Sequence, residues 1–294
     1  MNPSAFLTGC VANKGRDVPI FSVAFSPPNE GTVFYARPSA DWVRYSLEVD
    51  WPAIAMAALR YPSASDVLVV ALGAQGQFWE LEPGRSAQRT GQLPESISDI
   101  TNAAVALNAI WICGMDRIAW MRDVHGQWHD FSAPPGLLDE GVVGFTALAQ
   151  VGSDSLVAAG WRGEIWWRDR SGWQMQDSGS SANFNALTVT PDGEVIVVGD
   201  RGAIAQGSMG RWQPFATSAA FNLQDACCFD GEVFVCSDFE LFLWRDGALL
   251  PETRFAAQDR PGSCMRLRAG KHSLFSIGEG DVFDFQHGMW SRII

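Results

Sequence analysis

Lysine is almost absent from this chain of 294 residues, and charges of either sign are few. Lys14 and Lys271 are its only lysines, and 21 basic residues stand against 33 acidic ones, for a formal net charge of −12. Binding to nucleic acid or to an anionic membrane requires a basic surface, so the composition argues against both as direct partners. It favours a basic protein partner, because complementary fields speed association. The alternative is that the acidic charge serves solubility alone.

The cysteines lack the spacing that metal and redox sites require. No CxxC pair occurs among Cys10, Cys113, Cys227, Cys228, Cys236 and Cys264. We therefore expect no metal site and reduced thiols, as in a cytoplasmic protein. Residues 1–16 lack the basic start and apolar run of a secretion signal, and Leu7–Cys10 resembles a lipobox in its letters only. No apolar run approaches the ~18 residues of a membrane helix.

Signatures of catalysis are missing as well. The sequence contains no G-x-S-x-G, HExxH, P-loop or dinucleotide-binding motif. Two of the four histidines, His125 and His287, directly precede turn glycines, which indicates surface turns rather than acid–base catalysis. We therefore predict a non-enzymatic protein that needs no cofactor.

The sequence does contain a repeat, together with 29 glycines and 13 tryptophans. Short apolar segments recur, and each ends in a small residue, usually glycine. These segments lie about 40 residues apart, which is the length of four strands and three turns in one blade of a β-propeller. Their last residues are Ala36, Gly73, Gly114, Gly160, Gly199, Ser237 and Gly278.

We predict an all-β fold, a single seven-bladed β-propeller of four-stranded antiparallel blades. The repeated segment serves as the second strand, which is apolar throughout because neighbouring blades cover both of its faces. The fourth strand is polar and often opens with a tryptophan, which we expect to wedge between blades. Residues 1–17 are expected to add an edge strand that helps to close the ring. The predicted blades span residues 19–52, 54–93, 97–136, 143–179, 183–218, 221–255 and 262–294.

The stretch from Ala159 to Phe215 carries a family resemblance. Its segments GWRGEIWWRDRSGWQ, TPDGEVIVVGDRGAIAQ and GRWQPF resemble the repeats of sialidase/BNR-type propellers and of the photosystem assembly factor group. Fragments of the Asp-box pattern occur at Asp123–Trp128 and Asp169–Trp173, whereas a Trp-Asp dipeptide, the mark of WD repeats, does not occur. The resemblance implies a propeller, but propellers of this kind host many unrelated functions.

One set of residues remains as a candidate site. The turn after the second strand recurs in each blade, so its side chains should gather on one face, where acids outnumber arginines. Aromatic anchors flanked by charge are typical of protein-binding hot spots. The alternative is that turns favour Asp because it hydrogen-bonds the local backbone. The predicted partner-binding residues are Asp41, Trp42, Asp116, Trp161, Arg162, Asp200, Arg201, Asp238, Phe239, Glu240, Glu279 and Asp281.

These observations favour a protein-binding propeller, of which one concrete form is an inhibitor or immunity protein that neutralises a basic bacterial toxin such as a nuclease. Two alternatives stay open at this point. A glycan-binding or glycan-hydrolysing sialidase-like propeller would need a tyrosine nucleophile and a clamp of three arginines, but the only tyrosines are Tyr35, Tyr45 and Tyr61. An assembly or scaffold factor for a larger complex would bind several subunits rather than one toxin.

Overall fold

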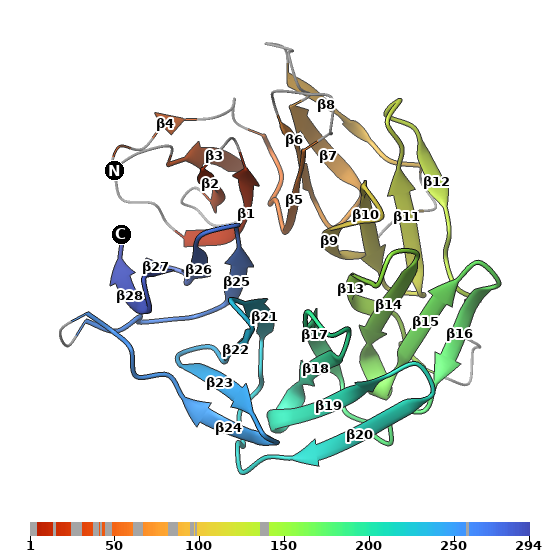
Figure 1. Ribbon diagram of the computed structural model, residues 1–294. Coiled ribbons are helices and arrows are strands. Elements are labelled where there is room, and N and C mark those ends of the chain that lie inside the picture. The colour runs from red at the N-terminus through yellow and green to blue at the C-terminus, as the bar shows by residue number, and fades with distance from the viewer. Residues whose placement is uncertain are drawn as a thin grey trace. The chain divides into compact units, whose positions relative to one another are not determined.

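The fold is built from seven sheets, each of four antiparallel strands that follow one another in the chain (Figure 1). The predicted all-β, seven-bladed β-propeller is therefore confirmed. The structure is a computed structural model that describes residues 5–13, 16–24, 31–37, 41, 43–44, 49–60, 67–81, 88–94, 97, 99–135, 141–256 and 259–294. Within these ranges the only helical segments are the two 3-10 turns η1 (Trp161–Gly163) and η2 (Asp200–Gly202).

The chain divides into two compact units, which we describe separately. Unit 1 comprises Met1–Asp99 and Thr253–Ile294, and unit 2 comprises Ile100–Glu252. The three sheets of unit 1 are β1 (Ala5–Asn13), β2 (Asp17–Ala24), β3 (Thr32–Ala36) and β4 (Val43–Arg44); β5 (Ala55–Arg60), β6 (Val67–Leu72), β7 (Gln77–Leu81) and β8 (Gln88–Gln92); and β25 (Arg266–Ala269), β26 (Leu274–Ile277), β27 (Val282–Gln286) and β28 (Met289–Arg292).

Unit 2 holds the other four sheets. They are β9 (Ile100–Ala106), β10 (Ala109–Gly114), β11 (Ile118–Arg122) and β12 (Trp128–Asp130); β13 (Phe145–Val151), β14 (Ser155–Gly160), β15 (Ile165–Asp169) and β16 (Gly172–Gln176); β17 (Phe184–Val189), β18 (Val195–Gly199), β19 (Ala203–Ser208) and β20 (Arg211–Ala216); and β21 (Asp225–Phe229), β22 (Glu232–Cys236), β23 (Leu241–Arg245) and β24 (Ala248–Pro251).

Burial falls steeply from the second strand of a sheet to its fourth. Every residue of β6, β10 and β18 is buried. In unit 2, both neighbouring sheets pack on β18, one against Val195 and Val197 and the other against Ile196 and Val198, as expected for a strand covered on both faces. The fourth strands β8 and β20 are exposed along most of their length. The apolar run of the second strand and the polar character of the fourth, which define the repeat in the sequence, therefore follow from position in the sheet.

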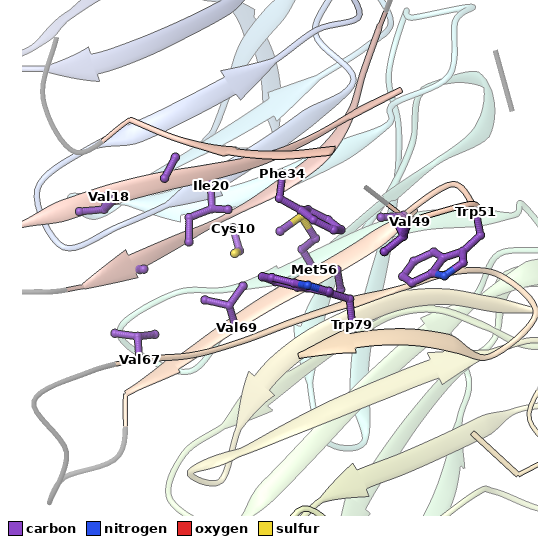
Figure 2. Packing of buried hydrophobic residues seen from close by; sticks show 14 residues of the cluster. Cys10, Val18, Ile20, Phe34, Val49, Trp51, Met56, Val67, Val69 and Trp79 are labelled. Carbon is purple, nitrogen blue, oxygen red and sulfur yellow. The ribbon is translucent and has the colours of Figure 1, made fainter. Parts of the chain in front are cut away.

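The hydrophobic core consists of clusters between neighbouring sheets. Figure 2 shows one in unit 1, where Ile20 and Phe34 of the first sheet meet Met56, Val69 and Trp79 of the second. The Phe34 and Trp79 rings are stacked with their centroids 4.6 Å apart. Large side chains from two sheets fill each seam, so the clusters hold neighbouring sheets together.

Tryptophans that open fourth strands occupy such seams, as the repeat predicts. Trp173 of β16 packs on the cluster between the third and fourth sheets. Its ring lies 5.3 Å from that of Phe145, and its indole N–H donates to the carbonyl oxygen of Phe131 at 2.5 Å. One end of the indole is thus apolar and packed while its polar end is satisfied.

The first sheet begins earlier in the chain than the repeat predicts. β1 pairs with β2 along its length, so residues 5–13 form the first strand of this sheet and not an added edge strand. Thr32–Ala36, which the repeat predicts as the second strand, is the third, β3. The repeat misses the true second strand, β2, because β2 does not end in glycine. In its burial, from Val18 to Ala24, β2 is nevertheless a typical second strand.

Candidate partner-binding site

Most of the predicted site residues lie at one end of unit 2. In a meander of antiparallel strands, the turn from second to third strand and the connection to the next sheet leave from the same end. Backbone hydrogen bonds join these segments here, from the N–H of Trp161 to the carbonyl of Gly144 at 3.1 Å and from that of Asp200 to Asn183 at 2.9 Å. We call this end the turn face. It comprises residues 114–118, 160–164, 199–203 and 236–241 with the connections 131–135, 141–144, 177–183 and 217–224.

Two of its turns are structural twins. Arg162 in η1 and Arg201 in η2 both have a left-handed backbone, with φ of 62° and 52°. The N–H of Arg162 donates to Oδ1 of Asn183, and that of Arg201 to Oδ1 of Asn222, both at 3.0 Å. Gly163 follows in η1, where a Cβ would lie 1.9 Å from a backbone oxygen. The backbone is therefore held rigidly, and each arginine side chain is exposed.

The acidic residues of the turn face differ in whether their carboxylates are hydrogen-bonded within the fold. Both carboxylate oxygens of Asp200 accept hydrogen bonds, from Asn183 Nδ2 at 3.2 Å and Asn185 Nδ2 at 3.1 Å. Asp238 accepts from Gln224 Nε2 at 2.9 Å. These two carboxylates therefore link a turn to the connection that precedes its sheet, and Asp200 also links its turn to the first strand of the same sheet. No such bond engages the exposed side chains of Asp116 and Glu240 within the described part of the chain.

Acids outnumber arginines among the solvent-accessible charges of this face. The acids are Asp116, Asp177, Asp200, Asp238 and Glu240, and the arginines are Arg162 and Arg201. The turn face is therefore acidic, with two arginines whose backbone positions are fixed.

Exposed aromatic rings gather on the same face. The side chain of Phe239 is 70% exposed and that of Trp161 is 36% exposed. The hydroxyl oxygen of Ser237 accepts the N–H groups of Phe239 at 3.3 Å and Glu240 at 3.1 Å, so the turn that carries Phe239 is ordered before any partner arrives. Such a ring loses little conformational entropy on binding.

The sequence reasoning missed Phe221, a third exposed aromatic on the turn face. It lies in the connection between β20 and β21 and stacks on Phe242, with ring centroids 5.5 Å apart. A signal was available, because Phe221 stands directly before Asn222, the counterpart of Asn183 in the preceding connection. Phe221 lies in a connection between sheets and not in a turn after a second strand, so the repeat does not mark it.

Two other turn residues, Arg117 and Glu164, are buried. The Arg117 Nε lies 3.1 Å from both Glu164 oxygens, and the guanidinium stacks on Trp166 at 5.0 Å. Only 6% of the arginine side chain and 4% of the glutamate side chain are exposed. The two charges form an ion pair that links two neighbouring sheets of unit 2.

The remaining predicted residues belong to unit 1. Asp41 and Glu279 are exposed, and Trp42 lies outside the described residues. Asp281 is 6% exposed, because its Oδ2 accepts from Arg292 Nη1 at 3.1 Å and from the N–H of Gly262 at 2.6 Å. Its predicted availability to a partner is therefore wrong, and its contacts are internal.

The described residues contain no group of three or more His, Cys, Asp and Glu side chains that could hold a metal ion. Across the same residues, no helix has the length and hydrophobicity to cross a membrane.

Comparison with known proteins gives a relative and a fold neighbour, while no protein-family model matches the chain. The chain is 31% identical to the immune protein Tsi7 of Pseudomonas aeruginosa over 231 residues. This aligned stretch covers 76% of this chain and 74% of the relative. A solved structure of YCF48 bound to D1 peptide superimposes with a TM-score of 0.56 at 17% identity, over 76% of this chain and 77% of that one. This second likeness concerns the fold alone, and the predicted kinship with sialidase-type repeats stays a prediction.

Proposed function

Because this chain belongs to the family of the immune protein Tsi7, we propose that it is an immunity protein that binds and neutralises a protein toxin. The observation that carries the proposal is the identity to that relative, which extends over about three quarters of both chains. We further propose that the chain acts without catalysis, by binding, and does so in the cytoplasm.

The turn face of unit 2 supports binding as the mode of action. Interface hot spots are rich in aromatic rings and arginines that are ordered before binding. Trp161, Phe221, Phe239 and the two twin arginines meet this description on a single face. We propose that the toxin docks there and that Phe239 is its main apolar anchor.

The charge of the chain supports a basic toxin, such as a nuclease. With a net charge of −12, the chain attracts a basic protein over a distance set by the ionic strength. The free carboxylates of Asp116 and Glu240 are the groups that would meet it on the turn face. Asp200 is less suitable for a charge-reversal test, because its carboxylate also holds Asn183 and Asn185.

The experiment begins with recovery of the toxin. The tagged chain is used at low salt to capture its partner from a lysate of the native cell, and the partner is then expressed in a host with and without this chain. We expect the chain to restore growth. Failure of the recovered protein to be toxic, or of the chain to protect, would contradict the proposal.

A pair of matched variants then tests the face. Phe239→Ala removes an exposed ring from the turn face, and Val124→Ala removes an exposed apolar side chain, 65% accessible, from the turn at the other end of its sheet. We expect Phe239→Ala to weaken toxin binding by about 2 kcal/mol or more, as for an interface hot spot, with an unchanged melting temperature. Val124→Ala should leave both unchanged. Equal affinities for the two variants would exclude the turn face.

A further inference from the structure

A polar pocket opens on the turn face, within unit 2. It has a volume of about 530 Å³ and lies between the β16–β17 connection, the η2 turn and the end of β20. The side chains that matter for its chemistry are Ser180, Ser181, Asn183, Asp200, Arg201 and Thr217. Pockets of this size can enclose a ligand or one or more side chains of a partner.

The acceptors in the pocket are largely used within the fold. Asp200 accepts from Asn183 and Asn185 with its two oxygens. The Thr217 hydroxyl donates to the carbonyl of Gly202 at 2.9 Å and accepts the N–H of Ala219 at 3.2 Å. These hydrogen bonds hold the acceptor groups in place in the wall of the pocket.

The donors, by contrast, are unused. The guanidinium of Arg201 carries five N–H donors, and it makes no hydrogen bond or ion pair with any residue the structure describes. The Ser180 hydroxyl accepts the N–H of Ala182 at 3.2 Å, which leaves its own hydrogen to donate. Ser181 is exposed, and its hydroxyl has no partner within the described chain. The unpaired groups therefore call for an anionic acceptor.

Arg201 is also held in place before a ligand binds. Its backbone N–H donates to Oδ1 of Asn222 at 3.0 Å, and the carbonyl of the following Gly202 accepts from the Thr217 hydroxyl at 2.9 Å. The turn cannot shift without losing these contacts, so the guanidinium stem leaves the backbone from a fixed point. A planar fork with a fixed stem suits a carboxylate, which it binds through two parallel hydrogen bonds.

We propose that this pocket is a carboxylate subsite, which receives an Asp or Glu side chain of the toxin on Arg201, Ser180 and Ser181. The proposal rests on the proposed function and sharpens it. The acidic surface would attract a basic toxin without fixing its orientation, whereas one buried carboxylate bound to an arginine with a fixed backbone position would set the orientation. A basic protein that lacks this carboxylate would leave the arginine unpaired in the interface, which disfavours the wrong partner.

The first test needs no toxin. Sodium acetate, the simplest carboxylate, is titrated into the isotope-labelled full chain against sodium chloride at equal ionic strength, and amide shifts are followed by NMR. We expect saturable shifts at Ser180, Ser181 and Arg201 that disappear in Arg201→Ala. The control is Arg211→Ala, which removes an exposed arginine at the other end of β20 in the same sheet and should keep the response. Absence of acetate shifts in the wild-type chain would overturn the subsite.

The second test uses the recovered toxin. Arg201→Ala should weaken binding by roughly 10- to 100-fold, the loss expected for a hydrogen-bonded charge contact, and Arg201→Lys should restore it only in part because it lacks the planar fork. In a double-mutant cycle, one Asp→Asn or Glu→Gln change in the toxin should cancel the effect of Arg201→Ala. Normal affinity of Arg201→Ala, with toxin still neutralised by the wild-type chain, would overturn the subsite and leave the proposed function intact.

Discussion

The buried pair of Arg117 and Glu164 allows a sharp stability prediction. The Glu164→Gln variant keeps the shape of the side chain and removes its charge. The guanidinium of Arg117 would then remain buried against Trp166 without its carboxylate partner, although the carbonyl of Pro134 at 3.1 Å would still accept from it. Neither side chain is more than 6% exposed, so water cannot replace the missing carboxylate.

The magnitude follows from this burial. Removal of one partner from a buried ion pair costs about 3–5 kcal/mol, because an uncompensated charge remains in the interior. At roughly 2 °C per kcal/mol for a protein of this size, the melting temperature should fall by about 5–10 °C. Replacement of both residues by methionine removes the stranded charge, and it should bring stability to within about 1 kcal/mol of the wild type.

Calorimetry and urea unfolding of the wild type, Glu164→Gln and the double methionine variant are the assays. The reasoning requires the single variant to be clearly less stable than the double variant. A Glu164→Gln protein with the same melting temperature as the wild type would refute the reasoning, because the pair would then be hydrated or dispensable. A double variant as unstable as the single one would show that packing, and not the stranded charge, dominates.

Three further predictions follow from side-chain environments. Burial raises the pKa of Cys10 and of Cys113 to about 12, so iodoacetamide at pH 8 should label neither in the folded chain, and rapid labelling of either would show that its strand opens. The side-chain hydrogen bond from His129, with backbone N–H donors, lowers the pKa of Asp123 to about 2 from 3.8. Because its folded pKa is depressed, its stabilising effect is present above about pH 4 and is lost as the pH falls towards 2. His129→Ala should raise the Asp123 pKa measured by NMR, and an unchanged value would contradict the assignment. Toxin association should slow as salt rises from about 50 to 500 mM while dissociation changes less; an association rate independent of salt would exclude electrostatic attraction to the turn face.

The repeat in the sequence was sufficient to predict the sheets because burial in a propeller is periodic. A second strand that is covered on both faces must be apolar along its length. Its apolar run therefore recurs in the sequence once in every blade. The first sheet departed from the prediction because β2 lacks the terminal glycine and β1 resembles no other first strand. Its pairing with β2 depends on contacts across the first sheet, which a search for one repeated segment does not detect.

The turn residues show where sequence reasoning reached its limit. The spacing of the repeat predicts Asp200, Arg201 and Phe239 at equivalent turns, and the structure puts all three on one face of unit 2. The repeat could not distinguish the free carboxylate of Glu240 from that of Asp200, whose partners Asn183 and Asn185 lie in the preceding connection and in the first strand of the same sheet. Nor could it show that Asp281 and Glu164 are buried.

The amino-acid sequence by itself determined the class of fold, the number of sheets and the acidic charge, because these depend on local apolar periodicity and on composition. Only the tertiary structure decided which turn residues are free to act. The turns that hold Arg162, Arg201 and Asp238 are each joined to an asparagine or glutamine of a neighbouring connection, and such contacts set both the exposure and the unused hydrogen bonds of a side chain. The pocket with unpaired Arg201 exists for the same reason, since its walls come from three segments that only folding brings together.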